Sequence, residues 1–242
     1  MQNQQPGSYA LIIFCLVLGT YNFHRLINSS GLNNPSVWLN WVNANRRGLW
    51  ILSIFSLLTG AGGLLIFVPF SLEIWIGTGL ISIISVWYVF PVVKKPLRDV
   101  PYIKTILIAA VWSFMLIYVP MGGILENKLW SSLTGFLFIY GITVPFDIRD
   151  MKYDEVEKRT LPMIIGMTSS KILSLVLVTA FYLYIAKINE KILESGFFIG
   201  SYLIYVGLIF GITPRSDDRW CVALDANLIP LGMAFYLSEI QL

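Results

Sequence analysis

Acidic residues are missing from the first 72 positions of this 242-residue chain, where the first carboxylate is that of Glu73. Charged residues of both signs make up only 13% of the sequence, which is little for a soluble domain. The single histidine, His24, excludes a histidine cluster as a metal site. The two cysteines, Cys15 and Cys221, lie in apolar runs without the spacing of metal ligands, which favours packed side chains over a redox pair.

Long apolar runs fill most of what remains. Apolar residues make up 56% of the chain, and the mean hydropathy is +0.71, which is typical of a multi-pass membrane protein. We therefore expect an all-α bundle of about eight transmembrane helices, forming a single integral-membrane domain over residues 1–242. The first run is expected to be a spanning helix and not a cleaved signal peptide, because no basic residue precedes it. The expected spans are about 9–26, 48–67, 72–90, 102–121, 129–146, 161–186, 196–212 and 220–237.

Basic residues divide the loops into two sets. Thirteen of the 17 lie in or beside the loops that follow spans one, three, five and seven. An excess of Lys and Arg marks cytoplasmic loops, so these four loops are expected to face the cytoplasm, with both termini outside. The net charge of +3 gives no indication of nucleic-acid binding. The thirteen residues are Arg25, Arg46, Arg47, Lys94, Lys95, Arg98, Lys104, Arg149, Lys152, Lys158, Arg159, Arg215 and Arg219.

Two of these loops have a simple structural interpretation. In the loop after span one, Trp38, Trp41 and Val42 have helical spacing, which predicts a short amphipathic helix lying at the membrane interface. An interfacial anchor is favoured there over a binding role. The loop from Arg215 to Arg219 is expected to be an ordinary solvated turn.

Two ionisable residues fall inside expected spans. Lys171 lies about ten residues into span six, and Asp225 lies a little inside span eight. Charges at membrane depth are costly and usually face a polar interior. A small-solute transporter would be the corresponding function, although the two halves of the chain carry no matching pair of Gly- or Pro-broken spans.

One polar stretch interrupts the apolar sequence. From Asp147 to Thr160, nine of fourteen consecutive residues are charged. On a helix, Asp147, Asp150 and Asp154 would lie within about 60° of one another. Like charges on one face repel unless they share a cation, and Mg²⁺ prefers such oxygen ligands. The alternative is a solvated acidic loop balanced by its own lysines and arginine.

The residues that follow this stretch make the pattern specific. Three aspartates spaced D-x-x-D-x-x-x-D are followed by Arg159, then Thr-Leu-Pro ending at Pro162, then Gly166. This run resembles the second aspartate-rich motif of the UbiA superfamily of intramembrane prenyltransferases. A weaker similarity lies at Tyr88 to Lys104, where the family carries a Tyr and a basic pair. Lys94 and Lys95 resemble that pair, but the spacing from Tyr88 is wider here, so which lysine corresponds stays open. Span one would then be equivalent to the family's second helix.

The resemblance implies an activity and a set of site residues. Such enzymes transfer a prenyl group from a polyprenyl diphosphate to an aromatic or other lipophilic acceptor, with Mg²⁺ bound by the aspartates. Here Asp147, Asp150 and Asp154 would be the catalytic, metal-binding residues. The site would face the cytoplasm in a bacterial-type cell membrane, among membrane lipids. The substrate-binding residues would be Asn22, Arg25, Tyr88, Lys94, Lys95 and Arg159.

The chain departs from the family at the first motif, which should read Asn-Asp-x-x-Asp at the end of span one. Asn22 stands in the place of the Asn, but His24 and Arg25 stand where acids belong. In one interpretation, the Arg25 guanidinium replaces a metal ion, because its planar fork suits phosphate oxygens. In the other, the site is degenerate and the protein is a non-catalytic membrane protein that binds a lipid or assembles with partners. His24 and Arg25 would then be interfacial anchors.

Overall fold

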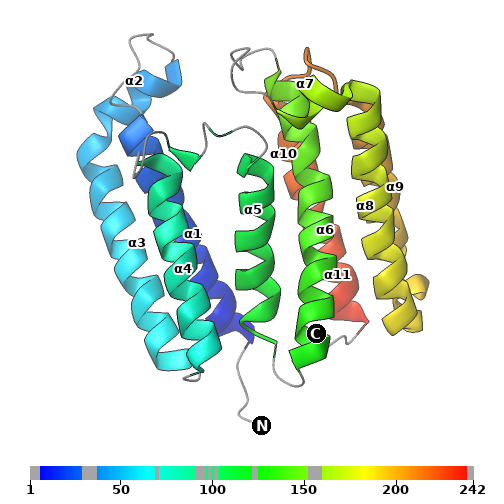
Figure 1. The fold of residues 1–242 in the computed structure, drawn as a ribbon, viewed down its shortest axis with the longest axis horizontal. Helices are drawn as coiled ribbons and strands as arrows, with labels where there is room; N and C mark the ends of the chain where they lie inside the picture. The colour runs from blue at the N-terminus through cyan, green and yellow to red at the C-terminus, as the bar shows by residue number, and fades with distance from the viewer. Residues whose placement is uncertain are drawn as a thin grey trace. The chain divides into compact units, whose positions relative to one another are not determined.

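The computed structural model describes residues 6–28, 37–68, 71–90, 96–97, 100, 103–121, 125–151 and 160–238. Within these residues all regular structure is helical. The chain divides into two compact units, Met1–Arg98 and Asp99–Leu242, and each is described by itself. The first holds α1 to α4 and the second α5 to α11 (Figure 1).

Six helices among the described residues are long and apolar enough to cross a membrane. They correspond to the predicted spans one, two, three, five, six and eight, and they support a multi-pass membrane protein. The predicted spans four and seven coincide with the shorter apolar helices Ile103–Tyr118 and Gly196–Gly211, so their crossing of the membrane stays a prediction. The six helices are Gly7–Ile27, Arg46–Phe67, Leu72–Val89, Asn127–Asp150, Met167–Ile188 and Asp218–Leu237.

In the first unit, α1 (Pro6–Asn28) packs along α3 (Arg46–Phe67), and α4 (Leu72–Val89) lies against α1 (Figure 1). Glycines allow α1 and α3 to approach closely. A Cβ added at Gly19 would lie 2.7 Å from Leu57 Cγ, and one at Gly63 would lie 2.6 Å from Ile12 Cγ1. Small residues at helix contacts are the usual way in which membrane helices gain dense packing.

The predicted amphipathic helix of the first loop is present as α2 (Val37–Ala44). Val42 is buried with Leu26 of α1 and Leu49 of α3, whereas Trp41 is exposed. One apolar side chain therefore ties α2 to the unit while a large aromatic ring stays on its surface. Such a ring is suited to the membrane interface, as the sequence predicts.

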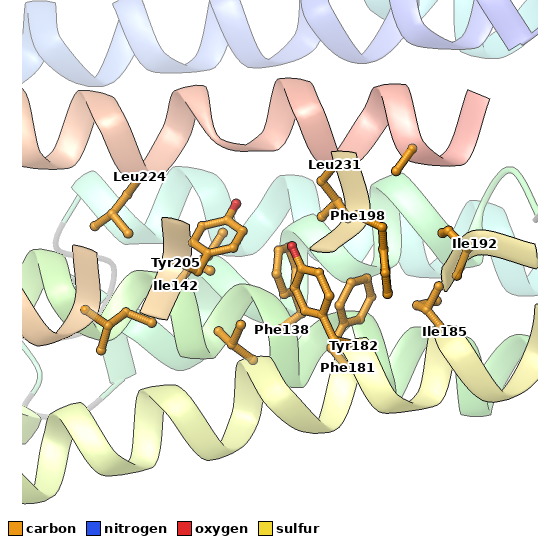
Figure 2. Packing of buried hydrophobic residues seen from close by; sticks show 13 residues of the cluster. Phe138, Ile142, Phe181, Tyr182, Ile185, Ile192, Phe198, Tyr205, Leu224 and Leu231 are labelled. Carbon is orange, nitrogen blue, oxygen red and sulfur yellow. The ribbon is translucent and has the colours of Figure 1, made fainter. Parts of the chain in front are cut away.

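The second unit is built around α6 (Leu125–Asp150), which packs against α5 (Ile103–Ser113) and α8 (Met167–Ile188). Behind them, α9 (Gly196–Gly211) packs against α8 and α11 (Leu228–Leu237). Aromatic rings fill the space between α6, α8 and α9, as Figure 2 shows. Phe138 stacks on Phe181 with centroids 4.3 Å apart and meets Tyr205 edge-on at 5.7 Å. Offset and edge-on ring pairs of this kind stabilise a core by more than the burial of their apolar area alone.

Three helix boundaries in the second unit differ from those expected. The fifth span does not end at 146, because α6 continues through Pro145 to Asp150. The sixth span is two helices, α7 (Leu161–Ile165) and α8, separated by Gly166 with φ of 83°. This left-handed conformation suits glycine because it has no Cβ. The eighth span is interrupted only by a turn residue, Asn227, between α10 (Asp218–Ala226) and α11, and the backbone of Asn227 stays in the right-handed helical region.

The remaining short elements complete the second unit. The helix α5 continues into one π-helical turn, η3 (Phe114–Tyr118), and α8 is followed by a 3₁₀ turn, η4 (Glu190–Glu194). The α10–α11 break is fixed from the side, because Asn227 Nδ2 donates to the carbonyl oxygen of Ser201 on α9 at 2.7 Å. The carboxyl end of α6, where Asp147 and Asp150 lie, is next to the first turn of α5 and the start of α10. Ion pairs of α6 with Lys104 of α5 and with Asp218 of α10 show this proximity.

Candidate functional site

The continuation of α6 past Pro145 decides how the first two aspartates are presented. Asp147 and Asp150 lie three residues apart in the last turn of α6, so they share a helix face. Asp147 is only 2% exposed, although it is a charged residue. The third aspartate of the pattern, Asp154, and the predicted phosphate-binding Arg159 lie outside the described residues, as do Lys94 and Lys95.

The first turn of α5 supplies partners for Asp147. Thr105 Oγ1 donates to Asp147 Oδ2 at 2.6 Å, and Lys104 Nζ donates to Asp147 Oδ1 at 3.4 Å. The same ammonium lies 3.7 Å from Asp150 Oδ2. One cation of the chain is therefore shared by two carboxylates, as the crowding of like charges on α6 requires. The positive end of the α5 dipole adds to this attraction.

Asp150 has a second cationic partner, which reaches further across the unit. Arg149 donates from Nε to Asp150 Oδ1 at 2.7 Å, and its Nη2 lies 2.6 Å from the same oxygen. Its Nη1 donates to Asp218 Oδ1, at the start of α10, at 3.0 Å. Thus charges alternate from Asp147 through Lys104, Asp150 and Arg149 to Asp218, joining α5, α6 and α10.

Sequence reasoning missed three members of this network. It left open which lysine between Tyr88 and Lys104 corresponds to the family's basic residue, counted Arg149 only as a charge on one side of the membrane, and assigned Asp218 to a solvated turn. Lys104 is 43 positions from Asp147, and Arg149 is 69 positions from Asp218, so no local spacing signals either contact. Asp218 itself is 90% exposed at its side chain, which agrees with a solvated position even though it pairs with Arg149.

The described carboxylates suit a hard divalent cation by their chemistry. Mg²⁺ in proteins is usually held by one or two carboxylates together with water and substrate phosphates. Asp147 and Asp150 supply two, and the position of the Lys104 ammonium shows that their oxygens can face one shared cation. A group of three or more His, Cys, Asp or Glu residues that could hold a metal is not found among the residues that the structure describes.

The site residues predicted in the first unit lie near the carboxyl ends of α1 and α4. Asn22 Nδ2 donates to the carbonyl oxygen of Leu18 at 2.9 Å, so the amide is turned along its own helix. Arg25 Nη2 donates to the Tyr21 hydroxyl at 2.6 Å, and the guanidinium carbon lies 4.3 Å from the centre of that ring. These contacts hold both side chains on α1.

His24 and Tyr88 are brought together across α1 and α4. His24 Nε2 donates to the carbonyl oxygen of Ser85 at 3.0 Å, and its ring stacks on Tyr88 with centroids 5.6 Å apart. Beside them, Phe23 meets Trp50 edge-on at 5.7 Å and lies 6.2 Å from Phe90. The end of the first unit therefore presents a cluster of aromatic rings in place of the carboxylates that a first metal motif would need.

The two charges predicted within spans take different positions. Lys171 is the fifth residue of α8, because Gly166 ends the preceding helix, and its Nζ donates to the carbonyl oxygen of Phe210 at 2.6 Å. It thereby caps α9 near its carboxyl end. Asp225 is an exposed residue one position before the end of α10. Neither observation adds support to a transport function.

Comparisons with known proteins give no assignment of the chain. No protein-family model, no curated protein and no solved structure matches it.

Proposed function

We propose that this protein is a UbiA-like, Mg²⁺-dependent prenyltransferase that moves a prenyl group from a polyprenyl diphosphate to an aromatic or other lipophilic acceptor. The observation that carries the proposal is that Asp147 and Asp150 both face the Lys104 ammonium. They do so at the end of a helix that is long and apolar enough to cross a membrane. These two residues begin the D-x-x-D-x-x-x-D pattern that precedes Thr-Leu-Pro.

In this function, Asp147 and Asp150 would hold Mg²⁺ together with Asp154. The metal would neutralise the charge that develops on the diphosphate as it leaves. The allylic carbon–oxygen bond breaks with its electron pair going to the diphosphate, and the acceptor forms the new bond and then loses a proton. Arg159 would add positive charge beside the phosphates. The substrate-binding roles expected of Asn22, Arg25, Tyr88, Lys94 and Lys95 stay predictions.

The surroundings of α6 suit an isoprenoid substrate. Its tail is apolar, and the spanning helices offer an apolar environment within the membrane. In our proposal the aspartate stretch lies on the cytoplasmic side of a bacterial-type cell membrane, which the concentration of Lys and Arg in one set of loops supports. The diphosphate group carries several negative charges and is costly to bring into the apolar membrane core. A site at the end of α6 would let this group stay in contact with water.

A second candidate function is a non-catalytic UbiA-like protein that binds a lipid or assembles with partners. Two observations favour it. The chain has no carboxylate before Glu73 from which to build a first metal site. In addition, Lys104 and Arg149 already neutralise Asp147 and Asp150 without a metal ion.

A binding and turnover experiment separates the two candidates. The purified protein in detergent would be given geranyl, farnesyl or geranylgeranyl diphosphate, with and without Mg²⁺, and both binding and diphosphate release with an aromatic acceptor would be measured. Prenyl transfer predicts Mg²⁺-dependent binding and release that Asp150→Asn and Asp154→Asn abolish. Glu190→Gln, an exposed carboxylate at the start of η4, is the matched control and should behave as wild type. Binding that ignores both Mg²⁺ and Asp150 would favour the non-catalytic candidate.

A further inference from the structure

We propose that Lys104 is a tethered counter-ion that occupies the cation position between Asp147 and Asp150 in the substrate-free protein. A divalent cation can enter only when the ammonium leaves, and Lys104 therefore disfavours binding of the metal without diphosphate. This inference rests on the metal site of the proposed function. It adds that the metal affinity of this site depends on whether diphosphate is present.

The four carboxylate oxygens are divided between two kinds of contact. The outer pair is held at short distances: Asp147 Oδ2 by Thr105 Oγ1 at 2.6 Å, and Asp150 Oδ1 by Arg149 Nε at 2.7 Å. The inner pair, Asp147 Oδ1 and Asp150 Oδ2, faces the Lys104 ammonium at 3.4 and 3.7 Å. Thr105 and Arg149 thus orient the carboxylates, whereas Lys104 fills the place between them.

The inner contacts are long for a charge-assisted hydrogen bond. Ammonium–carboxylate bonds of good geometry have donor–acceptor distances of about 2.7–2.9 Å. Lys104 Nζ contacts both carboxylates, and neither of its two distances reaches this short range. Its side chain is also about one-third exposed at 34%, so it can move toward water, which the nearly buried Asp147 cannot do. Of the two cations that contact Asp147 and Asp150, Lys104 therefore makes the longer contacts with these carboxylates, because Arg149 lies 2.6 and 2.7 Å from Asp150 Oδ1.

Charge balance explains why diphosphate would be needed for that displacement. If Asp147 were left without a cation it would be a buried, uncompensated charge, which is strongly unfavourable. A divalent cation alone would remove that problem but would leave the Lys104 ammonium next to a second positive ion. A diphosphate that arrives with the metal supplies the anion that the displaced ammonium can pair with. Metal and diphosphate would therefore bind cooperatively.

A titration with Mn²⁺, a paramagnetic substitute for Mg²⁺, tests this directly. Free Mn²⁺ would be measured by electron paramagnetic resonance over the full-length protein in detergent, without any prenyl substrate. We expect Lys104→Met to bind Mn²⁺ at least about tenfold more tightly than wild type, because no ammonium competes for the two inner oxygens. Lys104→Arg keeps a positive charge and should stay close to wild type.

The matched control is Lys128→Met. Lys128 is a buried lysine of α6, with its Nζ 5.4 Å from the centre of the Tyr118 ring. It lies at the other end of α6, about 28 Å from Asp147 at 1.5 Å per residue. Its removal should leave the Mn²⁺ affinity unchanged, and adding Asp147→Asn to Lys104→Met should abolish the tightened binding.

A second measurement does not depend on the folding of the Lys104→Met variant. In wild type, inorganic diphosphate should tighten Mn²⁺ binding at least about tenfold beyond what Mn²⁺–diphosphate complexation in buffer explains. Equal Mn²⁺ affinities in wild type and Lys104→Met, or no effect of diphosphate, would overturn the role of Lys104. Prenyl transfer with unchanged Mn²⁺ affinities would refute only this inference. Tightened Mn²⁺ binding without any prenyl transfer would refute only the proposed function.

Discussion

Lys171 of α8 donates from its ammonium to the carbonyl oxygen of Phe210, one residue before the end of α9, at 2.6 Å. The last carbonyls of a helix lack partners within the helix, and a cation there also meets the negative end of the helix dipole. A lysine within an apolar span, which by sequence alone indicates a polar cavity, therefore has a structural role as a cap between neighbouring helices.

Lys171→Met should destabilise the second unit by about 1–2 kcal/mol, because it removes a hydrogen bond from a charged donor while keeping most of the apolar stem. The free energy of unfolding would be measured by titration with a denaturing detergent. Lys187→Met is the control, since Lys187 is exposed in the last turn of α8. Equal stability of the two variants would show that the Lys171 bond contributes nothing.

Gly141 lies where α6 packs tightly against α8. A Cβ at this position would lie 3.1 Å from Leu177 Cβ, from the Ser174 carbonyl oxygen and from Val178 Cγ2, and Ser174 Oγ donates to the Gly141 carbonyl oxygen at 2.5 Å. We expect Gly141→Leu to destabilise the protein by about 2–3 kcal/mol, because the helices must separate and that hydrogen bond is lost. Denaturation in detergent would measure it.

The same substitution at Gly207 provides the comparison for Gly141. Gly207 lies on the exposed side of α9, and a Cβ there would meet no atom of the described residues within 4 Å. Gly207→Leu should be neutral or stabilising, because leucine has a higher helix propensity than glycine. A large loss of stability at both glycines would mean that close packing is not what Gly141 supplies.

Two buried tyrosines of the same core cluster should respond differently to loss of the hydroxyl group. Both rings are labelled in Figure 2. The Tyr182 hydroxyl lies 2.8 Å from Ser201 Oγ, whereas the fully buried Tyr205 hydroxyl has no hydrogen-bond partner among the described residues. Tyr182→Phe should cost about 1 kcal/mol, and Tyr205→Phe should leave stability unchanged or raise it by up to about 1 kcal/mol. Thermal unfolding of both variants in detergent would check the difference, and a loss at Tyr205 equal to that at Tyr182 would contradict it.

The membrane class and most helix positions could be predicted from the sequence, since long apolar runs and turn residues are local signals. The helix α2 was also predictable, because its Trp and Val spacing is helical. The break at Gly166 was not, because an isolated glycine in an apolar run is equally compatible with a continuous helix. The end of α6 was also missed, because the apolar run stops at 146 whereas the helix continues for four more residues to Asp150.

The candidate site was predictable only where its members are near one another in the sequence. Asp147 and Asp150 follow from their spacing. Lys104 and Asp218 contact the network from α5 and α10, and such long-range pairs leave no periodic pattern. Sequence reasoning could count these charges as cytoplasmic but could not say that they neutralise one another.

Arg149 provides a test of how far the network is a single unit. It contacts the partly buried Asp150 through two nitrogens and the exposed Asp218 through one. Its fork is fixed in geometry, which an ammonium cannot reproduce. We expect Arg149→Lys to cost about 1–2 kcal/mol of stability, and Asp218→Asn to cost less than about 1 kcal/mol, because exposed ion pairs are weak.

A double-mutant cycle measured by unfolding in detergent would separate the two contacts. The coupling between Arg149→Lys and Asp218→Asn should be below about 0.5 kcal/mol and should disappear at high salt, as is usual for exposed pairs. The coupling between Arg149→Lys and Asp150→Asn should be larger and should persist at high salt, because those side chains are only about one-fifth exposed, at 19% and 22%. Strong coupling to Asp218 would instead mean that the start of α10 helps to orient the carboxylates, and the candidate site would then extend across α5, α6 and α10.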